Sequence, residues 1–188
     1  MLVSTAPNDA DLATAGEVAC ASDDAVTLDD LPQLLERYGS RVERFCYSMT
    51  GNQDDAIDLA QDVFVIAIER RSSFRGGSSV ETWLLGIAVR LCRNSIRRQA
   101  IRRRVLGLFG RSLSDSLADP TEKAERSDEI QLGLSLLDVR SREVLVLRYF
   151  EGREVEELAE ILQLTRSAVD QRLSRARRKL AHWLSEQE

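Results

Sequence analysis

The sequence predicts an all-α protein made of two small helical domains joined by a flexible linker. Apolar residues recur at helical spacing in segments separated by glycine and capping residues, and no segment alternates like a half-buried strand. Charge is divided unevenly along the chain. The 188 residues carry a net charge of −5, yet residues 70–111 hold eleven arginines and one acid, whereas residues 1–36 hold eight acids and no base. Segregated charge of this kind favours basic surfaces for phosphates.

Four parts are expected along the chain. Residues 1–28 are rich in Ala, Asp, Ser and Thr without periodicity, which predicts an acidic disordered tail. Residues 29–106 would form the first domain. Residues 107–133, with several Gly, Ser and Asp residues and a proline, would form the linker. Residues 134–186 would form the second domain.

Three helices are expected in the first domain. One spans 31–49, and a second spans 55–71 with acids in its first turn, where the helix dipole favours them. The third runs to about residue 98. It begins where Ser78 and Glu81 have the spacing of a capping box.

A helix-turn-helix is predicted in the second domain. Residues 158–162 supply the first helix, Gln163 and Leu164 the turn, and Thr165 the cap of the second helix. At about 100° per residue, that helix has a narrow apolar seam and a polar face that suits a major groove. Residues 165–181 hold six bases against one acid, which favours DNA over a merely solvated face. The candidate contacts are Arg166, Ser167, Asp170, Gln171, Arg172, Arg175 and Arg178.

Basic and aromatic residues lie together around the start of the third helix. Bases stack on aromatic rings while cations attract the backbone, so this combination is typical of single-stranded nucleic-acid binding. Trp83 can instead close the core beneath the loop, and for this residue we favour that interpretation. The candidate contacts are Phe74, Arg75, Ser78, Ser79, Arg90, Arg93, Asn94 and Arg97.

The second helix presents acids and one apolar residue opposite its core seam. Such a face suits a protein partner that carries basic residues, although a solvated acidic face is the commoner explanation. Its members are Asp58, Gln61, Asp62, Val65 and Glu69.

Catalysis is not expected. His182 is the only histidine, and Cys20, Cys46 and Cys92 have no CxxC partner, so we predict no catalytic residue, metal site or cofactor. The sequence has no apolar run near 20 residues and no signal-peptide pattern. A cytoplasmic protein without membrane insertion is therefore expected.

Three blocks of sequence carry most of the motifs described above. They are DDAIDLAQDVFVIAIER, FRGGSSVETWLLGIAVRLCRNSIRR and LDVRSREVLVLRYFEGREVEELAEILQLTRSAVDQRLSRARRKL. Together they resemble the extracytoplasmic-function (ECF) branch of the sigma-70 family of bacterial RNA polymerase sigma factors. The resemblance covers about residues 30–185 in the family's order. Asp170 departs from it, because the family usually has lysine there, and Gln163 stands where a turn glycine is usual.

The resemblance implies a role for each surface. The first domain would be sigma region 2, with the acidic helix face on the clamp helices of the β′ subunit and the loop and third helix on the minus-ten element. The second would be region 4, which reads the minus-thirty-five element, and the β flap would be a further polymerase contact. The implied function is promoter recognition, melting and initiation at a stress- or signal-responsive regulon, under a cognate anti-sigma factor.

Other classes remain open at this point. A free-standing helix-turn-helix regulator acting without core polymerase would account for the second domain but not for the basic and aromatic block. A nucleic-acid-processing enzyme would need a carboxylate cluster for metal. An anti-sigma protein would lack the sigma motifs themselves.

Overall fold

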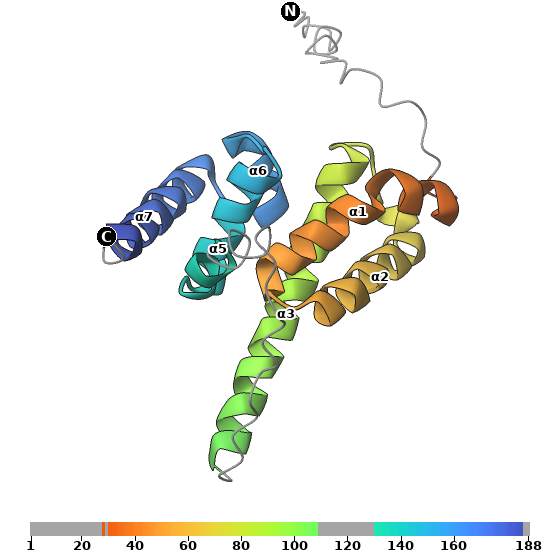
Figure 1. Ribbon diagram of the computed structural model, residues 1–188. Helices are drawn as coiled ribbons and strands as arrows, with labels where there is room; N and C mark the ends of the chain where they lie inside the picture. The colour runs from red at the N-terminus through yellow and green to blue at the C-terminus, as the bar shows by residue number, and fades with distance from the viewer. Residues whose placement is uncertain (1–27, 29, 109–129, 186–188) are drawn as a thin grey trace, which may run out of the picture.

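The computed structural model describes residues 28, 30–108 and 130–185. This part of the chain is built from helices and contains no strand, which confirms the all-α prediction (Figure 1). A 3₁₀ turn spans Arg71–Ser73, and α5 continues directly as a π-helical segment at Val146–Phe150. The α-helices are α1 (Leu31–Thr50), α2 (Gln53–Glu69), α3 (Val80–Leu108), α5 (Val139–Leu145), α6 (Val155–Leu162) and α7 (Arg166–Ser185).

Capping residues define where α1 begins and ends and where α2 begins. Asp30 caps α1 by accepting a hydrogen bond from the Gln33 N–H at 3.1 Å. Gly51 ends the helix with φ = 70°, a left-handed conformation that glycine adopts without steric cost. Asn52 then caps α2 through the Asp55 N–H at 2.8 Å. The second helix therefore starts two residues earlier than predicted.

The third helix differs from its prediction at both ends. Ser79, not Ser78, is the cap, and its hydroxyl accepts a hydrogen bond from the Thr82 N–H at 3.1 Å. The expected capping box does not form, because Glu81 pairs with arginines elsewhere. The helix continues to Leu108 rather than ending near Arg98, and its end projects beyond the other helices (Figure 1). Residues 98–106 contain no Gly or Pro, so no helix breaker interrupts them.

The core of the first domain lies between α1, α2 and α3. The core seam of α2 is buried, and Phe64 is buried beside Ala56, Leu59, Ala60, Val63 and Ala67. Cys46 of α1 and Cys92 of α3 are both fully buried thiols. The hydrogen bond with Cys46, together with burial, raises the pKa of Cys92 well above its ordinary value. Both cysteines are core residues, and its raised pKa keeps the Cys92 thiol protonated at neutral pH.

In the second domain, the helix-turn-helix is formed by α6 and α7. Leu158 is fully buried, and Gln163 joins the helices with φ = 55° in the left-handed region. This backbone conformation costs about 1–2 kcal/mol for a residue that has a Cβ. The turn glycine that is usual at this position would avoid that cost. Residues 130–135 are also helical, although 130–133 were expected to belong to the linker.

The two domains pack against each other. α6 lies on α3, where a Cβ added to Gly86 would lie 3.9 Å from the Ile161 carbonyl oxygen. The π-helical segment after α5 lies on α1 (Figure 1). The predicted acidic tail and most of the predicted linker fall outside the described residues. Among the helices that are described, none has both the length and the apolar character to cross a membrane.

Candidate nucleic-acid interface

α7 presents the face that was predicted to read duplex DNA. Thr165 precedes the helix, and its hydroxyl accepts a hydrogen bond from the Ala168 N–H at 3.3 Å, which confirms the predicted cap. Val169, Leu173 and Ala176 are buried against the rest of the domain. The predicted contacts that lie exposed on the opposite side are Arg166, Ser167, Asp170, Gln171, Arg175 and Arg178. One predicted contact, Arg172, is only partly exposed.

Arg166 is held only loosely in this structure. Its Nη1 lies 2.6 Å from Glu156 Oε1 of the preceding helix, and both side chains are mostly exposed. An exposed pair of this kind contributes roughly 0–1 kcal/mol and weakens with salt. Arg166 can therefore exchange this carboxylate for a phosphate or a base edge.

A basic cavity of about 580 Å³ lies between the start of α5 and the outer side of α7. Partial burial opposes ionisation of Asp138, but hydrogen bonds from Lys179 and Ser141 lower the pKa of its carboxyl to about 2. Five positively charged side chains surround that one carboxylate, so the cavity favours phosphate. The lining residues are Asp138, Arg140, Ser141, Arg172, Arg175, Arg178, Lys179 and His182.

The loop before α3 carries the predicted aromatic contact. The ring centroids of Phe74 and Trp83 are 5.3 Å apart at an interplanar angle of 50°. Trp83 is half-buried and packs against the hydrophobic core, as we favoured, whereas Arg75 is exposed. Ser79 also donates its hydroxyl to Thr82 Oγ1 at 2.9 Å, so in this structure Ser79 orients the start of α3.

The predicted basic face of α3 is divided by the second domain. Arg90, Asn94 and Arg97 are exposed. Arg93 instead makes two contacts of 2.6 Å with Glu143, from Nε to Oε2 and from Nη2 to Oε1. Of the predicted arginines on this face, Arg93 is therefore the one already engaged.

Glu143 is a functional candidate that the sequence reasoning missed. Its side chain is fully buried, and Arg172 Nη1 of α7 lies 3.4 Å from the same Oε1 that Arg93 contacts. A buried carboxylate is costly unless it is paired, and here an arginine from each predicted DNA-binding surface pairs with it. The available signal was an acid at the start of the apolar run EVLVL.

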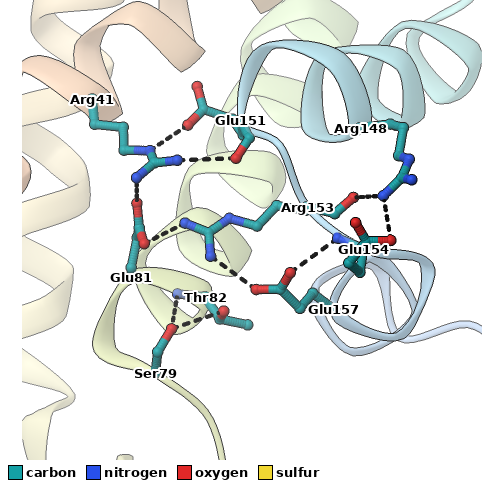
Figure 2. Close-up of polar contacts among 9 residues, drawn as sticks. All are labelled: Arg41, Ser79, Glu81, Thr82, Arg148, Glu151, Arg153, Glu154 and Glu157. Carbon is teal, nitrogen blue, oxygen red and sulfur yellow. Dashed lines mark hydrogen bonds and ion pairs between the residues drawn. The ribbon is translucent and has the colours of Figure 1, made fainter. Parts of the chain in front are cut away.

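A second ion-pair network connects the domains near the start of α3 (Figure 2). Arg41 of α1 binds the Glu151 carboxylate at 2.7 Å and also pairs with Glu81 of α3. Arg153 pairs with the same Glu81, and its Nη1 lies 2.8 Å from Glu157 Oε1. Burial opposes this charge, but Glu81 and Glu157 raise the pKa of Arg153. Burial likewise opposes ionisation of Glu157, but the Glu154 N–H and Arg153 lower the pKa of its carboxyl. These ionised residues join α1 and α3 to the start of α6.

Arg142 supplies a third polar contact between the domains. It donates from Nε to the Leu134 carbonyl at 2.8 Å and from Nη2 to the Ser135 carbonyl at 3.1 Å. Its Nη1 donates to the Met49 carbonyl, in the last turn of α1. Positive charge is favourable beside the C-terminal carbonyls of helices, although burial lowers the pKa of this guanidinium.

The acidic face of α2 points away from these contacts. All five predicted members are exposed, and Val65 is 53% exposed although it is apolar. Together they form a surface of negative charge around one apolar side chain. These members are Asp58, Gln61, Asp62, Val65 and Glu69.

An apolar groove of about 750 Å³ lies at the far end of the second domain. It runs between residues 130–134 and the last turns of α7, where Trp183 and Leu184 contribute to its wall. Tyr149 and Phe150 also line the groove, and both are about half exposed. The sequence reasoning did not find this surface, because its residues come from three separate segments.

Comparison with protein families matches both domains. The family model of sigma-70 region 2 matches residues 34–102, and that of sigma-70 region 4 matches residues 127–180. The chain is similar to the RNA polymerase sigma factor YlaC of Bacillus subtilis (strain 168), with 33% identity over 81% of this chain and 90% of the relative. It is also similar to the ECF RNA polymerase sigma factor SigX of the same organism, with 31% identity over 72% of this chain and 74% of the relative.

Two solved structures resemble the whole arrangement. The sigma factor RpoE in complex with the anti-sigma factor NepR from Bartonella quintana has a TM-score of 0.66 and 26% identity, covering 84% of this chain and 98% of that chain. CnrH in complex with the cytosolic domain of CnrY has a TM-score of 0.65 and 26% identity, covering 84% of this chain and 89% of that chain.

Proposed function

The chain belongs to the ECF branch of the sigma-70 family of RNA polymerase sigma factors, and we propose how its individual surfaces divide the work of initiation. One observation carries the proposal. A single chain presents an aromatic and basic surface, a separate basic helix face, and an acidic face with one apolar residue, on three different helices. Initiation needs these three activities: strand capture, duplex reading and attachment to polymerase.

The exposed face of α7 reads the minus-thirty-five element in the major groove. Arg175 and Gln171 have the side chains that bind guanine and adenine edges in bidentate geometry. Asp170, where the family usually has lysine, can accept a hydrogen bond from the amino group of cytosine. The basic cavity beside this face would hold the phosphate backbone and set the register of the helix. The full set of contacts is Arg166, Ser167, Asp170, Gln171, Arg172, Arg175 and Arg178.

The loop before α3 and the basic face of that helix bind the minus-ten element as a single strand. Phe74 lies at the rim of the loop, where one unstacked base can pack against its ring. Melting requires no covalent chemistry, because tighter binding to the open strand than to the duplex shifts the population toward open DNA. The contacts are Phe74, Arg75, Ser78, Ser79, Arg90, Arg93, Asn94 and Arg97.

Core polymerase is bound through two surfaces. The acidic face of α2 complements a basic partner, and Val65 supplies an apolar contact at its centre, which suits the β′ clamp helices. The apolar groove between residues 130–134 and α7 would take a helix of the second polymerase element, the β flap. Dividing attachment between the domains would hold both DNA-binding surfaces at the promoter.

Regulation and location follow from the same assignment. A cognate anti-sigma protein would hold this factor inactive until a stress or other signal releases it, as the complexes of RpoE with NepR and of CnrH with CnrY suggest. The protein would act in the cytoplasm, where polymerase and promoter DNA are found. It would act by binding alone, without enzymatic activity or a cofactor.

Run-off transcription tests the proposal. Purified core polymerase, the full chain and a library of promoter fragments should yield initiation that depends on the protein and on one promoter consensus. A variant with Asp62→Arg should lose initiation together with polymerase binding. Protection of a defined duplex by the protein alone, without any polymerase binding, would instead support a free-standing regulator, an alternative that accounts for the region 4 match but not for region 2.

A further inference from the structure

The two promoter-reading surfaces meet at one carboxylate. Arg93 belongs to the proposed minus-ten surface and Arg172 to the proposed minus-thirty-five surface, and both pair with Glu143. No other residue among those described pairs with an arginine of both surfaces. We propose that Glu143 holds the free protein closed and withholds Arg93 of the proposed minus-ten surface from DNA until the domains separate, while Arg172 pairs with the same carboxylate within the second domain.

The geometry favours competition between Glu143 and DNA for the same groups. Arg93 uses its Nε and Nη2 in a bidentate contact with the carboxylate, at 2.6 Å for each atom pair. A guanidinium binds phosphate or a guanine edge through the same fork. Arg93 therefore cannot bind Glu143 and a nucleotide with that fork at the same time.

Burial makes the contact a switch rather than a surface pair. Glu143 is fully buried, and the side chain of Arg93 is only 35% exposed. If the domains separated while Arg93 moved away, the carboxylate would lose its closest partner and would need water in its place. Closure and ion pairing consequently stabilise one another.

The network around Glu81 strengthens the same closed arrangement without using any proposed contact. Glu81 binds Arg41 within the first domain and Arg153 of the second, and its side chain is 19% exposed (Figure 2). Loss of its charge should loosen the interface while Glu143, Arg93 and Arg172 remain intact. Glu81 thus offers an independent way to open the protein.

The inference rests on the proposed function, because it treats Arg93 as a DNA contact. It adds that the ion pair between the domains weakens DNA binding by the isolated factor. When the binding-competent state is only a fraction of the population, the apparent dissociation constant rises by the inverse of that fraction. If one molecule in ten is open, opening the rest would tighten binding about tenfold.

The test compares the full chain with Glu143→Gln and Glu81→Gln. Small-angle X-ray scattering reports separation of the domains, and circular dichroism confirms folding. Fluorescence anisotropy at one fixed salt concentration reports affinity for two probes, a random single-stranded oligonucleotide and a random duplex. Glu36→Gln removes the same charge from an exposed position on α1 and is the control for the change in net charge.

Both variants should increase the radius of gyration and tighten binding to the single-stranded probe, beyond any effect of Glu36→Gln. Should Glu143→Gln fail to fold, Glu81→Gln carries the same comparison. Domain separation without tighter binding of the single-stranded probe would overturn the withholding of Arg93. Tighter binding to the duplex alone would also overturn it, since only the orientation of Arg172 would have changed. A separate result would contradict the proposed function itself: no initiation by the unaltered protein with core polymerase.

Discussion

Arg93 and Glu143 lie 50 residues apart in the sequence and form a bidentate ion pair across the two domains. The arginine comes from the middle of α3, and the glutamate from the short α5 of the second domain. Because Arg172 of α7 approaches the same carboxylate, Glu143 connects the two helices that we propose bind the promoter. Interactions at the promoter and within the free protein therefore depend on the same side chains.

Arg175 tests duplex reading. Arg175→Ala should weaken binding of the polymerase holoenzyme to its preferred promoter by about 1–3 kcal/mol, because a bidentate base contact is lost. The loss should be concentrated on promoters that carry the preferred upstream element. The measurement is holoenzyme affinity for promoters with and without that element. Arg177→Ala removes the same charge from the same helix, on the side of the groove proposed for polymerase, so any effect it has should be equal on promoters with and without the upstream element. Equal loss on every DNA would make Arg175 a phosphate contact instead.

Asp62 tests attachment to polymerase. Asp62→Arg places a positive charge on the acidic face of α2 and should cost about 1.5 kcal/mol or more in binding, as does the loss of a close interfacial charge pair. Binding to immobilised core polymerase is the measurement, with circular dichroism to verify helicity. Glu36→Arg makes the same charge change on an exposed part of α1 and should leave affinity unchanged. If both variants bind core equally well, the α2 face is only solvated surface.

Phe74 tests strand capture. Phe74→Ala removes the ring that packs against Trp83 and should reduce promoter opening, since a base stacked on an aromatic side chain contributes about 1–3 kcal/mol. A fluorescent base analogue in the minus-ten element would report opening by the holoenzyme. Phe74→Tyr retains a ring at this position and should open the promoter normally. A similar defect in both variants would point to a disturbed loop, and no defect in either would remove Phe74 from the site.

Asp138 tests the electrostatics beside the reading face. Its carboxyl accepts the Ser141 N–H at 3.0 Å and lies 2.6 Å from Lys179 Nζ, so Asp138→Ala should cost about 1 kcal/mol at neutral pH through the lost cap. The folded-state pKa of about 2 lies below the ordinary value of 3.8, so this stabilisation is present above pH 3.8 and disappears as pH falls through 2.

Urea unfolding at several pH values measures that dependence. The difference in stability between the unaltered protein and Asp138→Ala should be largest at neutral pH and should shrink toward pH 2. Asp138→Asn keeps a capping oxygen but loses the charge, and should fall between the two at neutral pH. A difference that stays constant between pH 7 and pH 2 would contradict the ionised pair with Lys179.

Local patterns determined most of the helices and the orientation of their faces. The buried seam of α7, its cap at Thr165 and the exposed acids of α2 were all predictable, because burial of one face repeats every 3.6 residues. Motif order and spacing also identified the family. The structure corrected local details, including the cap at Ser79 and the continuation of α3 to Leu108.

Only the tertiary structure decided which charged residues are engaged. By sequence, Arg90 and Arg93 are equivalent members of one basic face, yet Arg90 is exposed and Arg93 is paired with a buried carboxylate. Glu81 has the spacing of a capping residue but binds arginines of both domains. Periodicity describes how a helix divides its residues between two faces. Periodicity does not reveal which residues a face contacts, because those residues belong to a distant segment that only folding brings close.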